Sequence, residues 1–192
     1  MPPKYLDIKV SLPNESPPVK IHYMKLASQS DEVDRLVAEW QRERPDVDTA
    51  PLQVLSRVSR LARHLARERR TAFAAHDLEQ WSFDVLAALR RAGVPYELTP
   101  GSLLRRTLVT SGAMTNRLDR LEDVGFVQRL PDPADRRGVL VRLTPAGKRR
   151  VDACLADLVG REWQFLAPLD AADQRVLADL LRRMLVDFDR SE

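Results

Sequence analysis

Apolar residues recur with helical spacing through most of the chain from residue 31 onward. The first such segment places them at i, i+3, i+4 and i+7, which is one face of a helix: Val33, Leu36, Val37 and Trp40. Pro45 is expected to end this helix, and a longer one follows Pro51. A third helix is predicted from about Glu79 to Ala92, where Gly93 is a stop signal.

Shorter elements are predicted in the middle of the chain. Thr99 and Pro100 form an N-cap and first-turn pair that opens a helix through about Leu108. Ser111 can cap the next helix, which is expected to end at Gly125. The tight connection between the two helices predicts a helix-turn-helix.

Two β-rich segments follow, FVQRL and VLVRL, and they bracket PDPADRRG. This pattern predicts a hairpin with Pro and Gly at its bend. Thr144 and Pro145 then repeat the cap-and-start signal for a helix to about Leu166. The order helix, turn, helix, hairpin is typical of a winged helix-turn-helix, whose second helix enters the DNA major groove. The predicted fold is therefore mainly α with a small β-hairpin wing.

The last predicted helix follows Asp170 and carries a regular apolar stripe: Leu177, Leu180, Leu181, Met184, Leu185 and Phe188. Such a face must be buried somewhere. It packs either on its own domain or against a second copy of the chain.

Charge is distributed unevenly along the chain. Residues 101–150 hold 11 Lys and Arg against 5 Asp and Glu, a net of +6, whereas the other 142 residues hold 20 against 23, a net of −3. A basic segment in an otherwise slightly acidic chain indicates a polyanion-binding surface, although a solvated basic face would look similar. The absence of a long apolar run or a signal peptide leads us to expect a cytoplasmic protein with no membrane partner.

Little in the sequence favours catalysis or cofactors. The one cysteine, Cys154, excludes an intramolecular disulfide, and the three histidines are too far apart for zinc-ligand spacing. There is no nucleophile–base constellation, no phosphate-binding glycine loop and no acidic metal cluster. We expect no enzyme activity, no metal and no cofactor.

The helix over residues 111–125 has the two faces that groove reading requires. Its apolar residues cluster on one side: Met114, Leu118 and Leu121. The other side is small and polar, which allows close approach, and its candidate DNA contacts are Ser111, Thr115, Asn116 and Arg120. Arg117 lies at the boundary and points either to DNA or to the body of the protein. Asp119 and Asp123 also face outward, which opposes DNA binding.

Residues 111–151, SGAMTNRLDRLEDVGFVQRLPDPADRRGVLVRLTPAGKRRV, resemble the MarR family of winged-helix transcription regulators. RLEDVGFVQR, DPADRR and VRLTPAG carry the resemblance. It implies a homodimer that binds a pseudo-palindromic operator, with Arg136 and Arg137 at the wing tip and one of them in the minor groove. Asp132 or Asp135 would hold the tip in shape. A narrow minor groove concentrates negative potential that attracts arginine.

Within the family, the chain is most similar to the branch of urate-responsive regulators with an extra N-terminal helix. The resemblance assigns ligand-binding roles to four residues: Trp40, Asp84, Arg117 and Arg129. Trp40 and Arg117 would contact a flat anion, since arginine and tryptophan together suit such a ligand. Asp84 and Arg129 would link the pocket to the recognition helix. The expected ligand is urate-like, an aromatic acid or a small carboxylate. Each of these residues also has an ordinary structural interpretation.

The domain organisation follows from these assignments. Residues 30–78 hold the N-terminal helices for dimerisation and the ligand pocket, 79–147 the winged helix-turn-helix, and 148–192 the C-terminal dimerisation helices. Residues 1–29, rich in proline, are either an arm that packs on a partner subunit or non-native sequence, with Met24 as a possible start.

The leading functional interpretation is a ligand-responsive transcription regulator, which in the MarR family is more often a repressor than an activator. Two alternatives stay open. One is a redox-responsive regulator that acts through Cys154, which would require an exposed thiol in a positive environment. The other is a winged-helix module that binds proteins instead of DNA.

Overall fold

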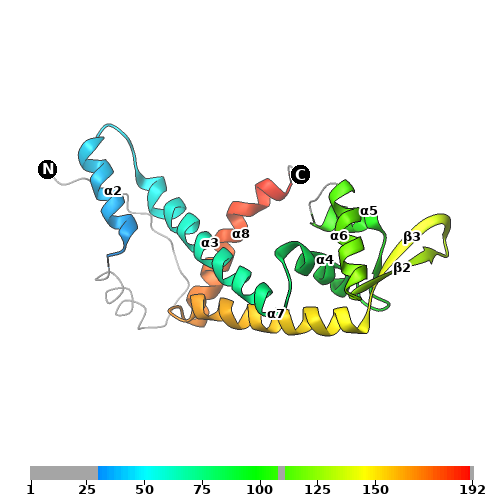
Figure 1. Ribbon diagram of the computed structural model, residues 1–192. Helices are drawn as coiled ribbons and strands as arrows, with labels where there is room; N and C mark the ends of the chain where they lie inside the picture. Colours follow the sequence, from blue (N-terminus) through cyan, green and yellow to red (C-terminus); the bar gives the residue numbers. More distant parts are fainter. Residues whose placement is uncertain (1–29, 108–110, 191–192) are drawn as a thin grey trace, which may run out of the picture. The chain divides into compact units, whose positions relative to one another are not determined.

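The computed structural model describes residues 30–107 and 111–190. The predictions for residues 1–29 lie outside this part of the chain. The chain divides into two compact units, and the boundary falls within helix α3 (Ala50–Ala75), after Arg60. The first unit holds α2 (Glu32–Glu43) and the start of α3, and all later elements belong to the second (Figure 1).

The start and end of α2 follow from its flanking residues. A carboxylate oxygen of Asp31 accepts hydrogen bonds from the backbone N–H of Val33 at 2.8 Å and of Asp34 at 3.1 Å. The Asp34 side chain accepts in turn from the backbone N–H of Asp31, which completes a capping box. The helix ends at Glu43, before Pro45, as the sequence predicts. Of its apolar stripe, only Val33 and Val37 are buried.

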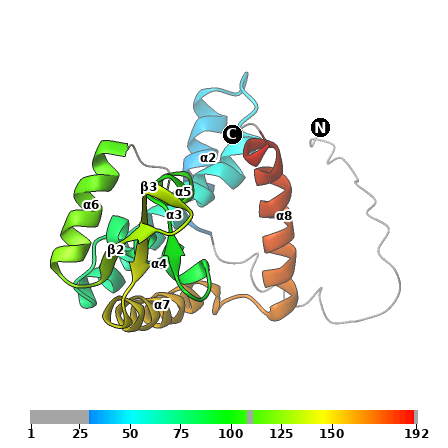
Figure 2. The same cartoon turned by 90° about the vertical axis from the view of Figure 1, so that its right-hand side faces the viewer.

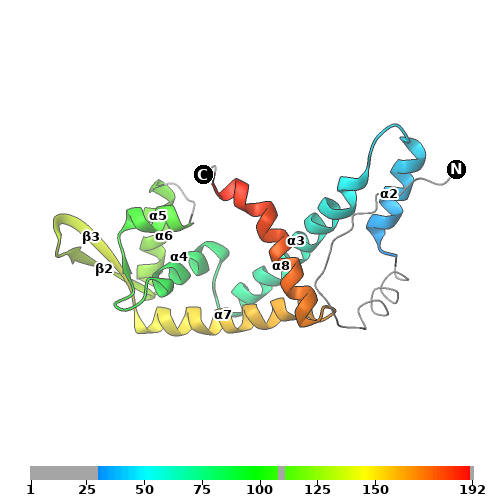
Figure 3. The same cartoon turned by 180° about the vertical axis from the view of Figure 1, so that it is seen from behind.

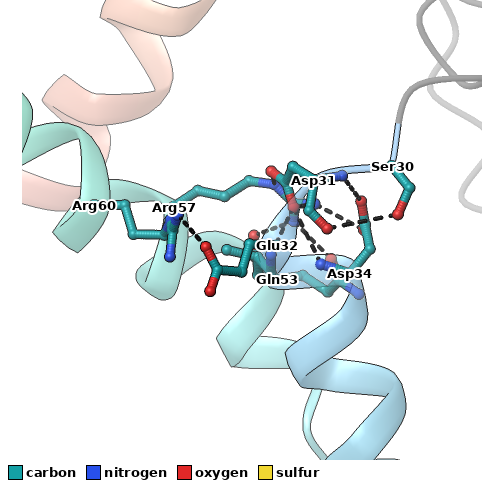
Figure 4. Close-up of polar contacts among 8 residues, drawn as sticks. Ser30, Asp31, Glu32, Asp34, Gln53, Arg57 and Arg60 are labelled. Atoms are coloured by element: carbon teal, nitrogen blue, oxygen red, sulfur yellow. Dashed lines mark hydrogen bonds and ion pairs between the residues drawn. The ribbon is translucent and has the colours of Figure 1, made fainter.

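Within the first unit, one arginine of α3 ties the N-terminus of α2 to α3 (Figure 4). The Arg57 guanidinium donates to Asp31 through Nε at 2.9 Å and to Asp34 through Nη2 at 2.7 Å. Its Nη1 also bonds the carbonyl and side-chain oxygens of Gln53, one turn earlier on α3. Although burial acts to raise the pKa of Asp31, hydrogen bonds from the Asp34 backbone and from Arg57 hold it below its usual value.

The second unit is built around α4 (Gln80–Arg91). Between Ser82 and Leu89, every residue of this helix except Asp84 is buried: Ser82, Phe83, Val85, Leu86, Ala87, Ala88 and Leu89. Around it lie α5 (Pro100–Thr107), α6 (Ser111–Asp123) and α7 (Pro145–Leu166), and α8 (Ala171–Asp189) follows α7. Figure 2 shows α6 beside the strands, with α4 and α7 in the same unit. The mainly helical architecture predicted from the pattern is confirmed.

A three-stranded antiparallel sheet accompanies these helices, with the order β1-β3-β2. The predicted hairpin is formed by β2 (Val127–Asp132) and β3 (Asp135–Leu143), and it projects beyond the helices of its unit (Figures 1 and 3). The short strand β1 (Glu97–Leu98), which pairs with β3, was not predicted from the sequence. An ion pair between Glu97 and Arg142 reinforces this pairing.

The bend of the hairpin differs from the prediction. The strands are joined at Pro133 and Ala134, so Gly138 lies within β3 rather than at the bend. The Asp132 side chain closes the turn early, because it accepts from the backbone N–H of Ala134 at 2.9 Å. A Cβ on Gly138 would lie 2.9 Å from the Cβ of Asp132, so glycine is needed for close approach of the strands. The expectation that Asp132 shapes the tip is therefore supported.

Several predicted caps are present in the second unit. The Thr99 hydroxyl accepts from the backbone N–H of Ser102, and that of Thr144 accepts from Gly147. Asp170 caps α8 through Ala172 and Asp173. These local signals explain why the helix starts could be located from the sequence.

Many large apolar side chains along α7 and α8 are exposed in the single chain: Leu155, Val159, Trp163, Val176, Leu177, Leu180, Leu181, Met184, Leu185 and Phe188. Helix α8 has no buried residue among those described, although its stripe is as apolar as predicted. Within the described ranges, no helix is both long and apolar enough to cross a membrane.

Substituting Arg57 with alanine should loosen α2 from α3 in the first unit. The change removes the guanidinium that joins Asp31 and Asp34 to α3, and it leaves the two carboxylates without this counter-charge. Hydrogen exchange of the α2 amides should become several-fold faster. Arg35→Ala is the matched control, since Arg35 pairs only with Glu32 on its own helix in the described contacts. Equal exchange in wild type and Arg57→Ala would show that the cluster does not hold α2.

Candidate DNA interface and ligand-binding residues

Helix α6 presents one buried and one exposed face, as the sequence predicts. Met114, Leu118 and Leu121 are each no more than 2% exposed and belong to the core of the second unit. Thr115 and Asn116 are exposed on the other face. The helix begins at Ser111, whose side chain lies outside the described part. Exposed hydroxyl and amide groups on a helix that follows a short connection are suited to reading base edges.

Arg129 joins the wing to α6. It lies on β2, and its guanidinium pairs with Asp119 through Nη2 and with Glu122 through Nη1, each at 2.6 Å. The backbone N–H of Arg129 also donates to Glu122 at 2.8 Å. Two carboxylates one turn apart on α6 therefore meet one cation of the strand. This arrangement fixes the direction of the hairpin relative to the helix.

The same contact changes the interpretation of Asp119. The sequence analysis counted its carboxylate against DNA binding, because it faces outward. In the structure, Arg129 compensates the negative charge of Asp119. The repulsion of DNA phosphates by α6 is correspondingly smaller than the sequence alone indicates.

Trp81 lies beneath two arginines of α6. The guanidinium carbon of Arg117 is 5.6 Å from the centroid of the indole ring, and that of Arg120 is 4.7 Å from it. The guanidinium of Arg117 thus lies against α4 in the single chain, and its predicted contact with DNA stays a prediction. Arg120 also pairs with Glu79 at 2.6 Å. A DNA contact by Arg120 would require its guanidinium to leave this site.

Neither Trp81 nor Glu79 was identified from the sequence. Hydrogen bonds from Trp81 and then from Arg120 lower the pKa of Glu79. A usable signal was present, because Trp81 stands one helical turn before Asp84 in QWSFD.

Asp84 is half-buried on α4, between the buried residues of that helix. Burial raises the pKa of Asp84, and the positive charges of Arg91, Arg117 and Arg69 act against this increase. Arg117 therefore influences Asp84 electrostatically, as the predicted ligand site requires. Arg129 does not contact Asp84 in the described interactions and instead bonds α6.

Trp40 and the wing arginines complete the predicted set. Trp40 lies on α2 in the first unit and is half-exposed, so it is not a core residue of that unit. Arg136 and Arg137 occupy the second and third positions of β3, immediately after the turn. Their side chains lie outside the described part of the structure. Their place beside the bend agrees with the predicted wing tip.

The chain matches the MarR family model over residues 76–138. It is 34% identical over 153 residues to the HTH-type transcriptional regulator PecS of Dickeya dadantii. This match covers 80% of this chain and 92% of that protein. It is also 38% identical over 111 residues to the multiple antibiotic resistance protein MarR of Escherichia coli, which covers 57% of this chain and 74% of the relative.

The chain belongs to the MarR family.

Solved structures of family members agree with this assignment. A variant of Escherichia coli MarR complexed with operator DNA matches with a TM-score of 0.57 and 30% identity, over 81% of this chain and 99% of that one. Bordetella bronchiseptica BpsR, whose DNA binding is regulated by 6-hydroxynicotinic acid, matches with a TM-score of 0.59 and 25% identity, over 72% and 96%. The MarR-family chain is thus a winged-helix transcription regulator and not an enzyme, as the sequence predicts.

The environment of the single cysteine disfavours redox sensing in this MarR-family chain. Cys154 lies on α7 with no exposed surface, and burial, with the nearby charge of Asp157, raises its pKa to about 11. A thiol with this pKa is protonated at neutral pH, whereas the thiolate is the reactive form.

Cys154 should therefore resist alkylation until the protein unfolds. Iodoacetamide at pH 7.5 should label the native protein at least about a hundredfold more slowly than the protein in denaturant, because the native thiol is buried and protonated. Mass spectrometry of timed samples measures both rates. Comparable rates in the two states would show that Cys154 is accessible and would restore the redox interpretation.

Proposed function

We propose that this protein is a ligand-responsive transcriptional repressor that binds a pseudo-palindromic operator as a homodimer and leaves it when a small anion binds. The observation that carries the proposal is the coupling of α6 to the wing by Arg129, in the most basic segment of the chain. A fixed helix and wing with net positive charge suit a DNA duplex. Such a regulator acts in the cytoplasm, where its operator is.

In the proposed complex, α6 enters the major groove. Thr115 and Asn116 are the exposed groups that would contact base edges, with Ser111 near the start of the helix. Arg136 and Arg137 would follow the wing into the adjacent minor groove. Arg120 would contribute only after exchanging Glu79 for a phosphate or a base.

The homodimer would cover the apolar faces of α7 and α8. Large side chains there are well exposed in the single chain, with Trp163 at 57% and Phe188 at 72%. Apolar surface of this extent on neighbouring helices usually marks an interface. A two-fold dimer would present two copies of α6 to two half-sites, which accounts for a pseudo-palindromic operator.

The ligand would act at Arg117. Its guanidinium already lies over an indole ring and close enough to Asp84 to influence that carboxyl. A flat anion such as urate, an aromatic acid or another small carboxylate would compete for Arg117. Trp40, in the first unit, stays a predicted ligand residue. The extra N-terminal helix of the urate-responsive branch would correspond to α2. The regulation of BpsR by 6-hydroxynicotinic acid supports an aromatic acid as one candidate.

Because Arg117 lies on α6, a ligand that moves it must also act on the recognition helix. Arg129 would transmit such a displacement to the wing through Asp119 and Glu122. Binding of ligand and binding of DNA would then be coupled, and each would weaken the other by the same factor.

The alternative of a protein-binding winged helix makes a different prediction about salt. DNA contacts to phosphates release counterions, so DNA affinity should fall steeply as salt increases. A mobility-shift titration with the intergenic DNA beside the protein's own gene, against nonspecific competitor, separates the two. Absence of specific, salt-dependent binding to any tested upstream DNA would favour the protein-binding module.

Replacing both Arg136 and Arg137 with alanine should weaken operator binding. The arginine that makes the specific contact should account for about 1–3 kcal/mol of the loss. The slope of log K against log salt should also fall by about one unit for each phosphate contact that is lost. Mobility shifts at several salt concentrations measure both quantities. Arg63→Ala on α3 is the control for a general loss of charge. Wild-type affinity in the double variant would contradict the wing assignment.

Replacing Arg117 with alanine should abolish release of DNA by ligand while leaving the dimer intact. Urate and 6-hydroxynicotinic acid are the first ligands to titrate against the protein–DNA complex. Arg120→Ala is the matched control, because it also removes a guanidinium from Trp81 but should keep the response. Normal release from the Arg117→Ala protein would remove Arg117 from the pocket, and sedimentation would verify its oligomeric state.

A further inference from the structure

A hollow lies in the winged-helix unit, and Arg117 is not among the residues that line it. It is lined by His76 just after α3, by Phe126 between α6 and β2, and by the first turns of α7. Its volume is about 300 Å³, which is at the lower end of the range for small-molecule sites. Neither the predicted DNA contacts nor the predicted ligand residues line it.

The wall formed by α7 is one helical face. Ala146, Arg149, Arg150 and Ala153 stand at i, i+3, i+4 and i+7. The two alanines leave the space of the hollow open, and the two arginines place positive charge beside it. The sequence carried this pattern, AGKRRVDA, but its function was not assigned.

Arg150 is held in place by the protein. Its Nη1 donates to the backbone carbonyl of His76 at 2.9 Å and to the carboxylate of Asp77 at 3.0 Å, and its guanidinium lies 5.4 Å from the ring centroid of Phe126. Both of these bonds use Nη1, whereas a guanidinium has five N–H donors. A bound carboxylate would therefore meet a cation that needs no reorganisation.

The electrostatics of the hollow favour an anion. Helix α7 has no acidic residue in its first turn, so the positive end of its dipole is not neutralised there. The nearby carboxylates already have partners: Asp77 pairs with Arg150, and Asp157 lies 3.0 Å from Arg161 and 3.5 Å from His76. Arg149 is exposed at the rim and adds a further positive charge.

We propose that this hollow binds a small planar aromatic carboxylate. Arg150 and Arg149 would bind the carboxylate group, while the ring would lie against Phe126 and between the two alanines. Phe126 lies in the connection between α6 and β2, and its backbone N–H donates to the carbonyl oxygen of Leu121 in α6 at 2.9 Å. A bound ligand would thus contact a residue that is hydrogen-bonded to the last turns of the recognition helix. That regulatory consequence rests on the proposed DNA-binding function, whereas the binding itself does not.

Isothermal titration calorimetry of the full chain with benzoate, without DNA, tests the site. Benzamide is the probe control, since it keeps the ring and shape but removes the charge. Two variants change the hollow without removing a contact of the core. Arg149→Gln removes an exposed cation, and Ala153→Leu fills the space with a side chain that an exposed helix position tolerates. Arg70→Gln, an exposed arginine on α3, controls for net charge.

Benzoate should bind saturably with one site of this kind per chain, and benzamide should bind at least about tenfold more weakly, because a charge-assisted contact is lost. Arg149→Gln should weaken benzoate binding about fivefold or more, and Ala153→Leu should abolish it. These titrations are made in the Arg117→Ala background, because the site proposed at Arg117 would itself take an aromatic acid. In that background, Arg70→Gln should leave benzoate binding unchanged. No benzoate binding, equal binding of benzamide, or wild-type affinity in Ala153→Leu would each overturn the proposal.

Discussion

The ion pairs of Arg129 with Asp119 and Glu122 are the constraint on which the DNA-reading surface depends. A winged helix must present its helix and its wing to two grooves at once, so the geometry between them has to be defined. Backbone pairing fixes the strands relative to each other, and Val127, Val141 and Leu143 belong to the same core as the buried face of α6. To this packing, one guanidinium of β2 adds a directional contact, because it meets two carboxylates of α6.

Helix α6 is also held by contacts of two different kinds. The buried side chains of Met114, Leu118 and Leu121 attach it to the core, and such packing tolerates little displacement. Arg117 and Arg120 instead share one indole ring and one exposed carboxylate, Glu79. Exposed ion pairs and cation–π contacts are individually weak. An anion can therefore redirect these arginines at small cost and act on α6 through them.

The sequence was sufficient for features set by neighbouring residues. Caps such as Thr144 and the alternation of buried positions in α6 are local, so helix starts and the mainly α fold with its wing were predictable. Contacts across elements were not. The partners of Arg129 depend on how β2 crosses α6, and the role of Trp81 depends on two arginines 36 and 39 residues later. The hairpin bend was misplaced because Gly138 is required for strand approach, which resembles a turn signal in sequence.

Asp84 would link ligand binding at Arg117 to the pH of the solution. Burial favours the protonated form of Asp84, and the positive charges of Arg91, Arg117 and Arg69 favour the ionised form. A ligand that neutralises Arg117 removes one of these charges, so the pKa of Asp84 must rise and its carboxyl must bind protons more tightly. By thermodynamic linkage, protonation of Asp84 must in turn favour the ligand-bound state. Release of DNA would then be assisted by falling pH, with the carboxyl of α4 sensing the same arginine that α6 presents.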